Sequence, residues 1–124
     1  MAASVPDDVH RDPAITDPEF YRVLWENEQV RVLEYRDLPG DETTAHDHPN
    51  SVLIALTGFQ RRLSVGDQTR DVELPFGAAQ WLPAQSHRGK NTGTTPTHTI
   101  LVELKGDSGT AKPGAIGPDN LGSR

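Results

Sequence analysis

Three histidines have the chemical type and the spacing needed to bind one metal ion. His46 and His48 are separated by a single residue, and His87 follows later in the chain. Successive side chains of a β-strand point to opposite faces, so His46 and His48 would project to the same side. If His87 approaches from an opposing strand, three imidazoles can occupy one face of a divalent ion and leave its remaining positions for water or substrate.

A His-x-His pair by itself also fits two solvated or hydrogen-bonded histidines. If the three residues do form a metal site, nitrogen-only ligation suits one divalent transition metal ion out of Fe, Mn, Co, Ni, Cu and Zn. Each ligating imidazole then needs a hydrogen-bond partner that fixes its tautomer. The polar residues near the histidines in the sequence that could serve are Ser51, Gln85 and Asn91.

Other residues could line a substrate pocket or act in catalysis. His98 shares its parity with the apolar members of an alternating run at residues 97–105, so it could face the interior as a catalytic general base or an additional ligand. A hydrogen-bonded structural role is the alternative. Trp81 and Tyr35 could wall the pocket or serve as structural residues. Arg62 would contact a ligand only if its face of the strand points inward, and otherwise lies on a solvated face.

The elements that must position these residues are short strands. Apolar, β-branched or alternating runs recur every eight to twelve residues between glycine, proline and aspartate turns, and no segment has the pattern of a long amphipathic helix. This pattern predicts an all-β sandwich or barrel, and a barrel of this size encloses a small-ligand cavity. Besides a strand that carries His46 and His48, the expected strands are residues 20–26, 30–35, 51–56, 59–65, 69–74, 79–82, 86–90 and 97–105.

Length and composition limit what this site can belong to. A chain of 124 residues allows a single domain with one compact core. The net charge of −6 argues against a nucleic-acid partner, which needs a basic face, and favours a small-molecule substrate. The absence of cysteine excludes disulfides, thiolate metal ligands and cysteine nucleophiles. No leader or membrane-spanning run is recognisable, so we expect a cytoplasmic protein without a membrane partner.

The two ends of the chain differ in composition from its middle. Residues 1–18 are rich in proline and aspartate, which predicts a flexible N-terminal arm whose acidic residues, Asp12 and Asp17 among them, serve solvation. Residues 107–124 are rich in glycine and proline and are expected to form a flexible or loosely docked tail. The barrel is therefore expected to occupy residues 19–106.

The glycines, the proline and the asparagine around the histidines follow a regular framework. Its positions in order are Gly40, His46, His48, Gly58, Gly77, Pro83, His87 and Asn91. This framework resembles the two motifs of the cupin superfamily, and the resemblance covers roughly residues 20 to 105. It implies a single-domain, cupin-type double-stranded β-helix, which is a jelly-roll barrel, often a homodimer, with a metal ion held inside by the motif histidines. We accordingly expect a homodimer.

The segments H-D-H-P-N-S-V-L-I-A-L-T-G and W-L-P-A-Q-S-H-R-G-K-N-T-G resemble a narrower group, the small single-domain cupins known as beta-alanine degradation proteins. Function in that group is poorly defined, so this closer resemblance implies no substrate. The chain also departs from the superfamily pattern. Ser51 stands where the first cupin motif usually has a glutamate ligand, and Gln85 occupies a glycine position of the second motif, which is one residue shorter before His87.

No acidic residue lies between His48 and Gly58, so the resemblance implies a three-histidine site of the kind found in some thiol dioxygenases. Three neutral imidazoles leave a divalent ion with its full charge, which favours a small, oxygen-rich, anionic ligand. We expect a metal-dependent enzyme, either a dioxygenase or a Lewis-acid isomerase, cyclase or lyase. The alternative is a non-catalytic protein that keeps the metal ion for structure or for binding a small ligand.

Overall fold

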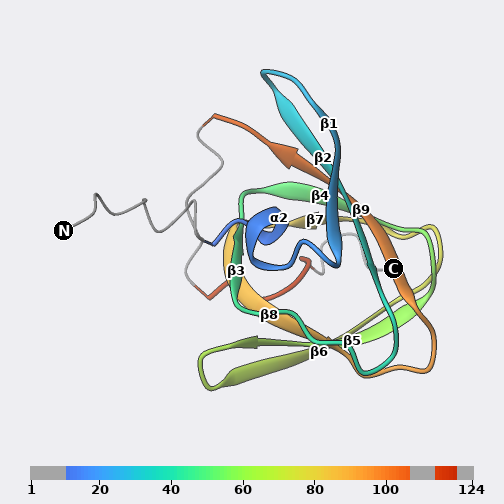
Figure 1. The fold of residues 1–124 in the computed structure, drawn as a ribbon. Helices are drawn as coiled ribbons and strands as arrows, with labels where there is room; N and C mark the ends of the chain where they lie inside the picture. The colour runs from blue at the N-terminus through green and yellow to red at the C-terminus, as the bar shows by residue number, and fades with distance from the viewer. Residues whose placement is uncertain (1–10, 107–113, 120–124) are drawn as a thin grey trace.

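The structure is a computed structural model, and it describes residues 11–106 and 114–119. Within these ranges nine strands form two antiparallel sheets that face each other, and one short helix precedes them (Figure 1). One sheet has the strand order β1-β2-β9-β4-β7, and the other has the order β3-β8-β5-β6. The elements are α2 (Pro13–Thr16), β1 (Tyr21–Glu26), β2 (Val30–Asp37), β3 (His46–His48), β4 (Ser51–Ala55), β5 (Phe59–Val65), β6 (Gln68–Leu74), β7 (Ala79–Leu82), β8 (Gln85–Asn91) and β9 (Thr97–Leu104).

The prediction of an all-β barrel is confirmed, and each predicted strand has a counterpart in the structure. The two-residue turn at Gly66 and Asp67 joins β5 to β6, with Gly66 at a φ of 57°, a conformation that favours glycine. One detail of the strand prediction is wrong. The almost wholly apolar run at residues 51–56 is typical of a strand that is buried on both faces, but Val52 and Ile54 on its outer face are only half-buried.

Alternation along β9 shows which side chains fill the barrel. Thr97, Thr99, Leu101 and Glu103 are buried, whereas the residues between them are half-buried on the outer face. The apolar core consists of two clusters between the sheets. They are Tyr21, Leu33, Tyr35, Leu82 and Leu101 in one, and Ala55, Phe59, Leu63, Val72 and Leu74 in the other. The barrel interior is therefore apolar along its walls, with polar residues at defined positions.

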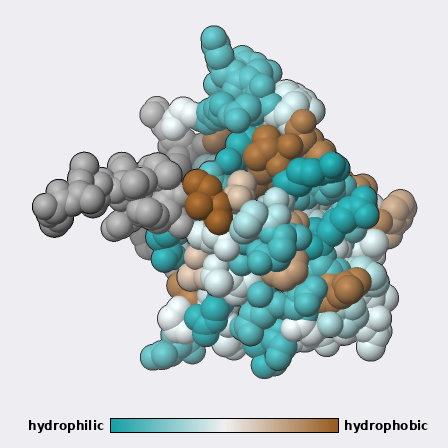
Figure 2. Space-filling view, in the orientation of Figure 1, coloured by the Kyte–Doolittle hydropathy of each residue, from teal (hydrophilic) through white to brown (hydrophobic). Residues whose placement is uncertain are grey.

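The outer face of the five-stranded sheet carries a row of apolar side chains. In register across the sheet, the row consists of Trp25, Val32, Val102, Val52 and Trp81. The indole groups at the two ends belong to exposed residues, Trp25 at 55% and Trp81 at 37%. The interpretation of Trp81 as a pocket wall or core residue is wrong, because its neighbour Leu82 takes the inward position on β7. On the side of the molecule shown in Figure 2, hydrophilic residues predominate and separate hydrophobic patches lie among them.

Residues 11–18 pack against the barrel instead of forming part of an arm. Asp12 caps α2 by accepting a hydrogen bond from the backbone of Ala14 at 2.9 Å, and it also pairs with Arg31 on β2 at 2.8 Å. Asp17 is 2% exposed, so it is a buried anchor and not a solvating residue. The rest of the predicted arm, residues 1–10, lies outside the described residues.

The described part of the C-terminal segment, residues 114–119, also contacts the barrel. Arg70 on β6 donates to the carbonyl oxygens of Ile116 and Pro118 at 2.7 and 2.8 Å. The remainder of the predicted tail, residues 107–113 and 120–124, is not among the described residues. In the part of the chain that is described, no helix is long and apolar enough to cross a membrane.

Candidate metal centre and its cavity

The three histidines meet where β3 pairs with β8. His46 lies directly across from His87, and His48 lies one inward position further along β3. All three are buried, and the ring centroids are 4.7 Å apart for the two β3 histidines and 5.0 Å apart from each of these to His87. One ring nitrogen of each lies within 4.8 Å of the others. The alternation that puts both β3 histidines on the inner face thus brings three imidazoles around one point.

The Nδ1 atoms of two of these histidines face hydrogen-bond acceptors. His46 Nδ1 lies 2.9 Å from the carbonyl oxygen of Thr44 and 3.3 Å from Asp17 Oδ2. His87 Nδ1 lies 2.7 Å from the side-chain oxygen of Gln85. An acceptor at Nδ1 fixes the proton there and leaves Nε2 with its lone pair, which is the arrangement that metal-ligating histidines use. The predicted partner Gln85 is therefore in contact, and Asp17 adds an unexpected carboxylate.

The third histidine faces a carboxylate that comes from a neighbouring strand. His48 Nδ1 lies 3.5 Å from Glu103 Oε2, and the other Glu103 oxygen accepts from Arg31 Nε at 2.9 Å. Glu103 lies across from Ser51 in the register of β9 and β4. Glu103 and Asp17 thus lie behind the histidines at their Nδ1 atoms. The group of candidate metal ligands among the described residues consists of the three histidines and includes neither carboxylate.

Ser51 makes no hydrogen bond to any of the three histidines. Its hydroxyl oxygen is buried and has no hydrogen-bond partner among the described residues. Asn91 also lies away from the three rings, since its amide nitrogen donates to Asp37 Oδ1 at 3.0 Å and to the carbonyl oxygen of Thr95 at 2.9 Å. Neither residue therefore holds a histidine as Gln85 does, and Asn91 instead holds the loop before β9.

Burial keeps two of the imidazoles neutral. Loss of solvation lowers the pKa of His46 to about 3, with the neighbouring His48 acting in the same direction. Loss of solvation likewise holds the pKa of His87 well below its ordinary value, and the other two histidines add to this effect. Metal ligation requires neutral imidazole, so these rings need no proton release at neutral pH. The donor set and its hydrogen bonds fit a divalent transition metal ion.

A cavity of about 50 Å³ extends from the histidines into the barrel. This is room for a few water molecules or a very small ligand. Its polar lining residues are the three histidines together with Tyr21, Tyr35, Thr43, Arg61, Thr97 and Thr99. Its apolar lining includes Leu53, Phe59, Leu63, Val72, Leu82 and Leu101.

Of the predicted pocket residues, Tyr35 lines this cavity and Arg62 does not. Arg62 is exposed on the outer face of β5 and pairs with Asp71 at 2.8 Å. Its neighbour Arg61 is the arginine that points inward. His98 is on the outer face of β9, where its Nε2 lies 2.8 Å from Glu34 Oε2. It is therefore neither an additional ligand nor a general base in the cavity.

Sequence reasoning missed Tyr21, Asp17, Glu103, Arg61 and the partner of Arg61, Asp37. Tyr21 places its hydroxyl oxygen 3.4 Å from His46 Nε2. No signal in the sequence pointed to Glu103, because alternation along residues 97–105 placed the apolar parity, and not that of Glu103, on the expected inner face. No local signal distinguishes Arg61 from Arg62, because the face of the strand that turns inward depends on its partners.

Comparison with known proteins gives matches to solved structures only. No protein-family model and no curated protein matches the chain. A cupin domain from Bordetella pertussis Tohama I is 27% identical, with a TM-score of 0.65, over 69% of this chain and 92% of that chain. An RmlC-like cupin family protein with a double-stranded β-helix fold from Methanocaldococcus jannaschii is 17% identical, with a TM-score of 0.56, over 68% and 77% of the two chains.

A third solved structure is the polyketide cyclase RemF from Streptomyces resistomycificus. It is 18% identical, with a TM-score of 0.54, over 72% of this chain and 73% of that chain. At these identities the latter two matches concern the fold alone. The chain has the double-stranded β-helix of cupin domains, as the spacing of its glycines and histidines implied.

Proposed function

We propose that the protein is a metal-dependent enzyme for a small, anionic, oxygen-rich molecule, with one divalent transition metal ion held by His46, His48 and His87. One observation carries this proposal: three buried imidazoles each place one ring nitrogen within 4.8 Å of the others, and all three line the same cavity. A structural cluster of histidines would have no need of a cavity beside it. The resemblance to beta-alanine degradation proteins stays a prediction and supplies no substrate.

The residues of the chain would prepare the site in three ways. Gln85 and Glu103 hold the imidazoles of His87 and His48 through Nδ1, so that Nε2 faces the cavity. Burial raises the pKa of Tyr21, whose hydroxyl group thus remains a hydrogen-bond donor beside His46. The apolar wall excludes water and strengthens electrostatic interactions inside. A divalent ion bound there would act as a Lewis acid toward a substrate oxygen or, if it is iron(II), would support chemistry with dioxygen.

Two classes of reaction suit this arrangement: oxidation by dioxygen, and Lewis-acid isomerisation, cyclisation or elimination. The polyketide cyclase among the matched structures supports the second class only through the shared fold, which hosts many chemistries. The open side of a three-histidine centre supports either class.

A second candidate function is binding of a small ligand without turnover. It is favoured by the position of His98, which leaves the cavity without the predicted general base. It is also favoured by the small size of the cavity, about 50 Å³. Under this alternative the metal ion would only capture the ligand.

Turnover assays on metal-loaded protein distinguish these functions. The protein is loaded separately with iron(II), zinc and nickel, and His87→Ala treated in the same way is the control. Oxygen consumption with small thiols, diketones and catechols tests the dioxygenase class, and loss of substrate without oxygen uptake tests the isomerase, cyclase and lyase class. Turnover that requires His87 supports the enzyme. Binding of the same compounds without turnover under every metal would leave the binding protein as the better description.

A further inference from the structure

The cavity beside the three histidines is enclosed almost entirely by buried residues. Among the described residues that line it, all but Leu53 are buried. Its volume of about 50 Å³ holds no more than a few water molecules or a very small ligand. A larger substrate can therefore enter only if part of the wall moves.

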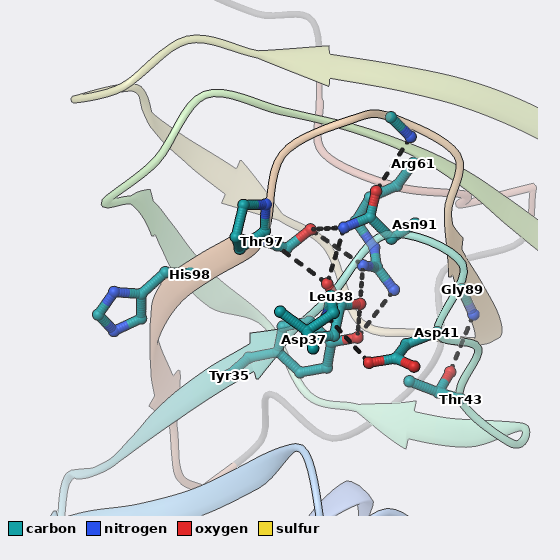
Figure 3. A network of polar contacts seen from close by, with 12 residues as sticks. Tyr35, Asp37, Leu38, Asp41, Thr43, Arg61, Gly89, Asn91, Thr97 and His98 are labelled. Carbon is teal, nitrogen blue, oxygen red and sulfur yellow. Dashed lines mark hydrogen bonds and ion pairs between the residues drawn. The ribbon is translucent and has the colours of Figure 1, made fainter.

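Two of the described lining residues lie outside the strands, and these are Thr43 and Pro118. Thr43 is fixed to β8, because its N–H donates to the carbonyl oxygen of Gly89 at 2.8 Å and its hydroxyl oxygen accepts from the Gly89 N–H at 2.9 Å (Figure 3). Pro118 belongs to the segment 114–119, which is part of neither sheet. Movement of this segment would therefore open the wall without breaking the pairing of the strands.

The segment 114–119, red in Figure 1, is attached to the barrel largely by two side chains. Arg70 donates to two of its backbone carbonyl oxygens. Gln85 donates to the carbonyl oxygen of Gly117 at 3.1 Å and accepts from the N–H of the same residue at 2.5 Å. One backbone hydrogen bond, from Asp119 to a carbonyl oxygen of β7, measures 2.8 Å. A few such bonds cost far less to break than a strand ladder, so the segment can be released while the barrel stays folded.

Gly117 and Pro118 are the buried residues of this segment, and they form part of the cavity wall. A Cβ atom added to Gly117, whose φ is 73°, would lie 3.0 Å from Leu63 Cδ1 and 3.3 Å from Val72 Cγ2. Leu63 and Val72 both line the cavity, as does Pro118. The docked segment thus closes the wall next to these residues of β5 and β6, and the tight contact and the positive φ both favour glycine at position 117.

The docked segment also contacts the residue that holds His87. The side-chain oxygen of Gln85 accepts from the N–H of Gly117 and lies 2.7 Å from His87 Nδ1. On release of the segment Gln85 would lose both of its bonds to Gly117 and keep the one from its amide nitrogen to the carbonyl oxygen of Pro83 at 2.8 Å. The position of the segment therefore affects how one of the three histidines is held.

We propose that the segment 114–119 is the gate of the cavity. Docked, it closes the wall, and Pro118 limits the size of the molecule that the cavity holds. Released, it opens the route by which a small molecule reaches the histidines, as active-site lids do in other proteins. That the admitted molecule is a substrate rests on the proposed function, whereas the gate does not require a metal ion.

The test measures how fast a reagent reaches the histidines of chelator-treated protein. Diethyl pyrocarbonate modifies neutral imidazole, and mass spectrometry of peptides gives the rate at His87 relative to His98, which lies on the outer face of β9. Arg70→Ala removes two hydrogen bonds to the gate, so His87 should react at least about fivefold faster than in wild-type protein. Arg62→Ala is the matched control, because it removes an exposed arginine that pairs with Asp71 and not with the gate.

A second pair of variants displaces the gate without changing Arg70. Gly117→Ala adds a methyl group against the cavity wall and should also accelerate the modification of His87. Gly114→Ala is its control, because Gly114 has a similar φ of 77° but a Cβ atom there meets nothing within 4 Å. The rate in Gly114→Ala should stay near that of wild-type protein.

Repeating the measurement in low concentrations of urea separates release of the gate from unfolding of the whole chain. A rate set by the gate changes little with urea, whereas a rate set by global unfolding rises steeply. An unchanged rate in both Arg70→Ala and Gly117→Ala, or an acceleration that rises with urea as steeply as global unfolding, would overturn the proposal. Metal content of the same proteins is read separately: a gated rate in a protein that binds no metal keeps the gate and removes the metal centre, and the reverse result does the opposite.

Discussion

Acidification of the metal-free protein should destabilise the fold through its buried histidines. In the folded state the pKa of His46 is lowered to about 3, chiefly by loss of solvation, from an ordinary value of 6.5. Between these values the unfolded chain binds a proton at this site and the folded chain does not. The free energy of unfolding therefore falls as the pH drops below about 6.5, and the loss from this residue stops growing near pH 3.

The size of the effect follows from the interval between the pH and the pKa of the unfolded chain. At about pH 5, which is roughly 1.5 units below 6.5, His46 alone should cost about 2 kcal/mol relative to neutral pH. His87 acts in the same direction, because its pKa is also lowered by burial. Glu34 does not interfere in this range. Its pKa is lowered to about 2, first by the hydrogen bond from His98, so its contribution is lost only as the pH falls below 4.5.

Urea unfolding of chelator-treated protein at several pH values between about 7.5 and 5 measures this loss. The matched variant is His46→Gln, whose amide nitrogen can still donate to Thr44 but cannot take up a proton. In this variant the loss at pH 5 should shrink by about 2 kcal/mol. A free energy of unfolding that stays constant over this range, or an identical loss in the variant, would refute the assignment of a neutral, buried His46.

Three further predictions concern the partner of His87, the attachment of the C-terminal segment and the oligomeric state. Gln85→Leu removes the acceptor that holds His87 Nδ1 and should weaken metal binding by about 10- to 100-fold in a competition titration; an unchanged affinity would contradict the role of Gln85. Arg70→Ala removes two hydrogen bonds to the segment 114–119 and should lower the free energy of unfolding by about 1–3 kcal/mol, measured in urea. The expected homodimer should give twice the chain mass in light scattering, and a monomer at high concentration would remove that expectation.

Strand positions could be predicted because they depend on local features. Alternation and turn residues mark where each strand begins and ends, and the spacing of His46 and His48 puts both on one face of a strand whatever its partners are. The glycine framework around these histidines added the resemblance to cupins, and the solved structures agree with it on the fold. His87 lies beside the other two histidines because β8 pairs with β3 in a register that places it across from His46.

The inward face of a strand was harder to predict than the strand itself. On β9 the apolar parity was expected to face the interior, but the polar parity, with Thr97 and Glu103, is the buried one. The barrel interior contains a polar site, so the usual rule that apolar residues point inward fails there. On β5 the sequence likewise did not show which face points inward. Arg62 was therefore considered as a pocket residue, whereas its neighbour Arg61 is the one that lines the cavity.

Residues outside the strands were misjudged for a different reason. The composition around Asp17 is typical of a solvated segment, yet its carboxylate accepts a hydrogen bond from the backbone of Thr44 at 2.9 Å and lies beside His46. Such docking depends on a partner formed elsewhere in the fold, and neither periodicity nor composition reports it.

The metal content of protein purified without an affinity tag or chelator tests the central claim most directly. Elemental analysis should find one divalent transition metal ion per chain in wild-type protein, and His87→Ala should lose it while remaining folded by circular dichroism. Wild-type protein without stoichiometric metal, together with divalent-ion binding that neither His46→Ala nor His87→Ala alters, would contradict the three-histidine centre.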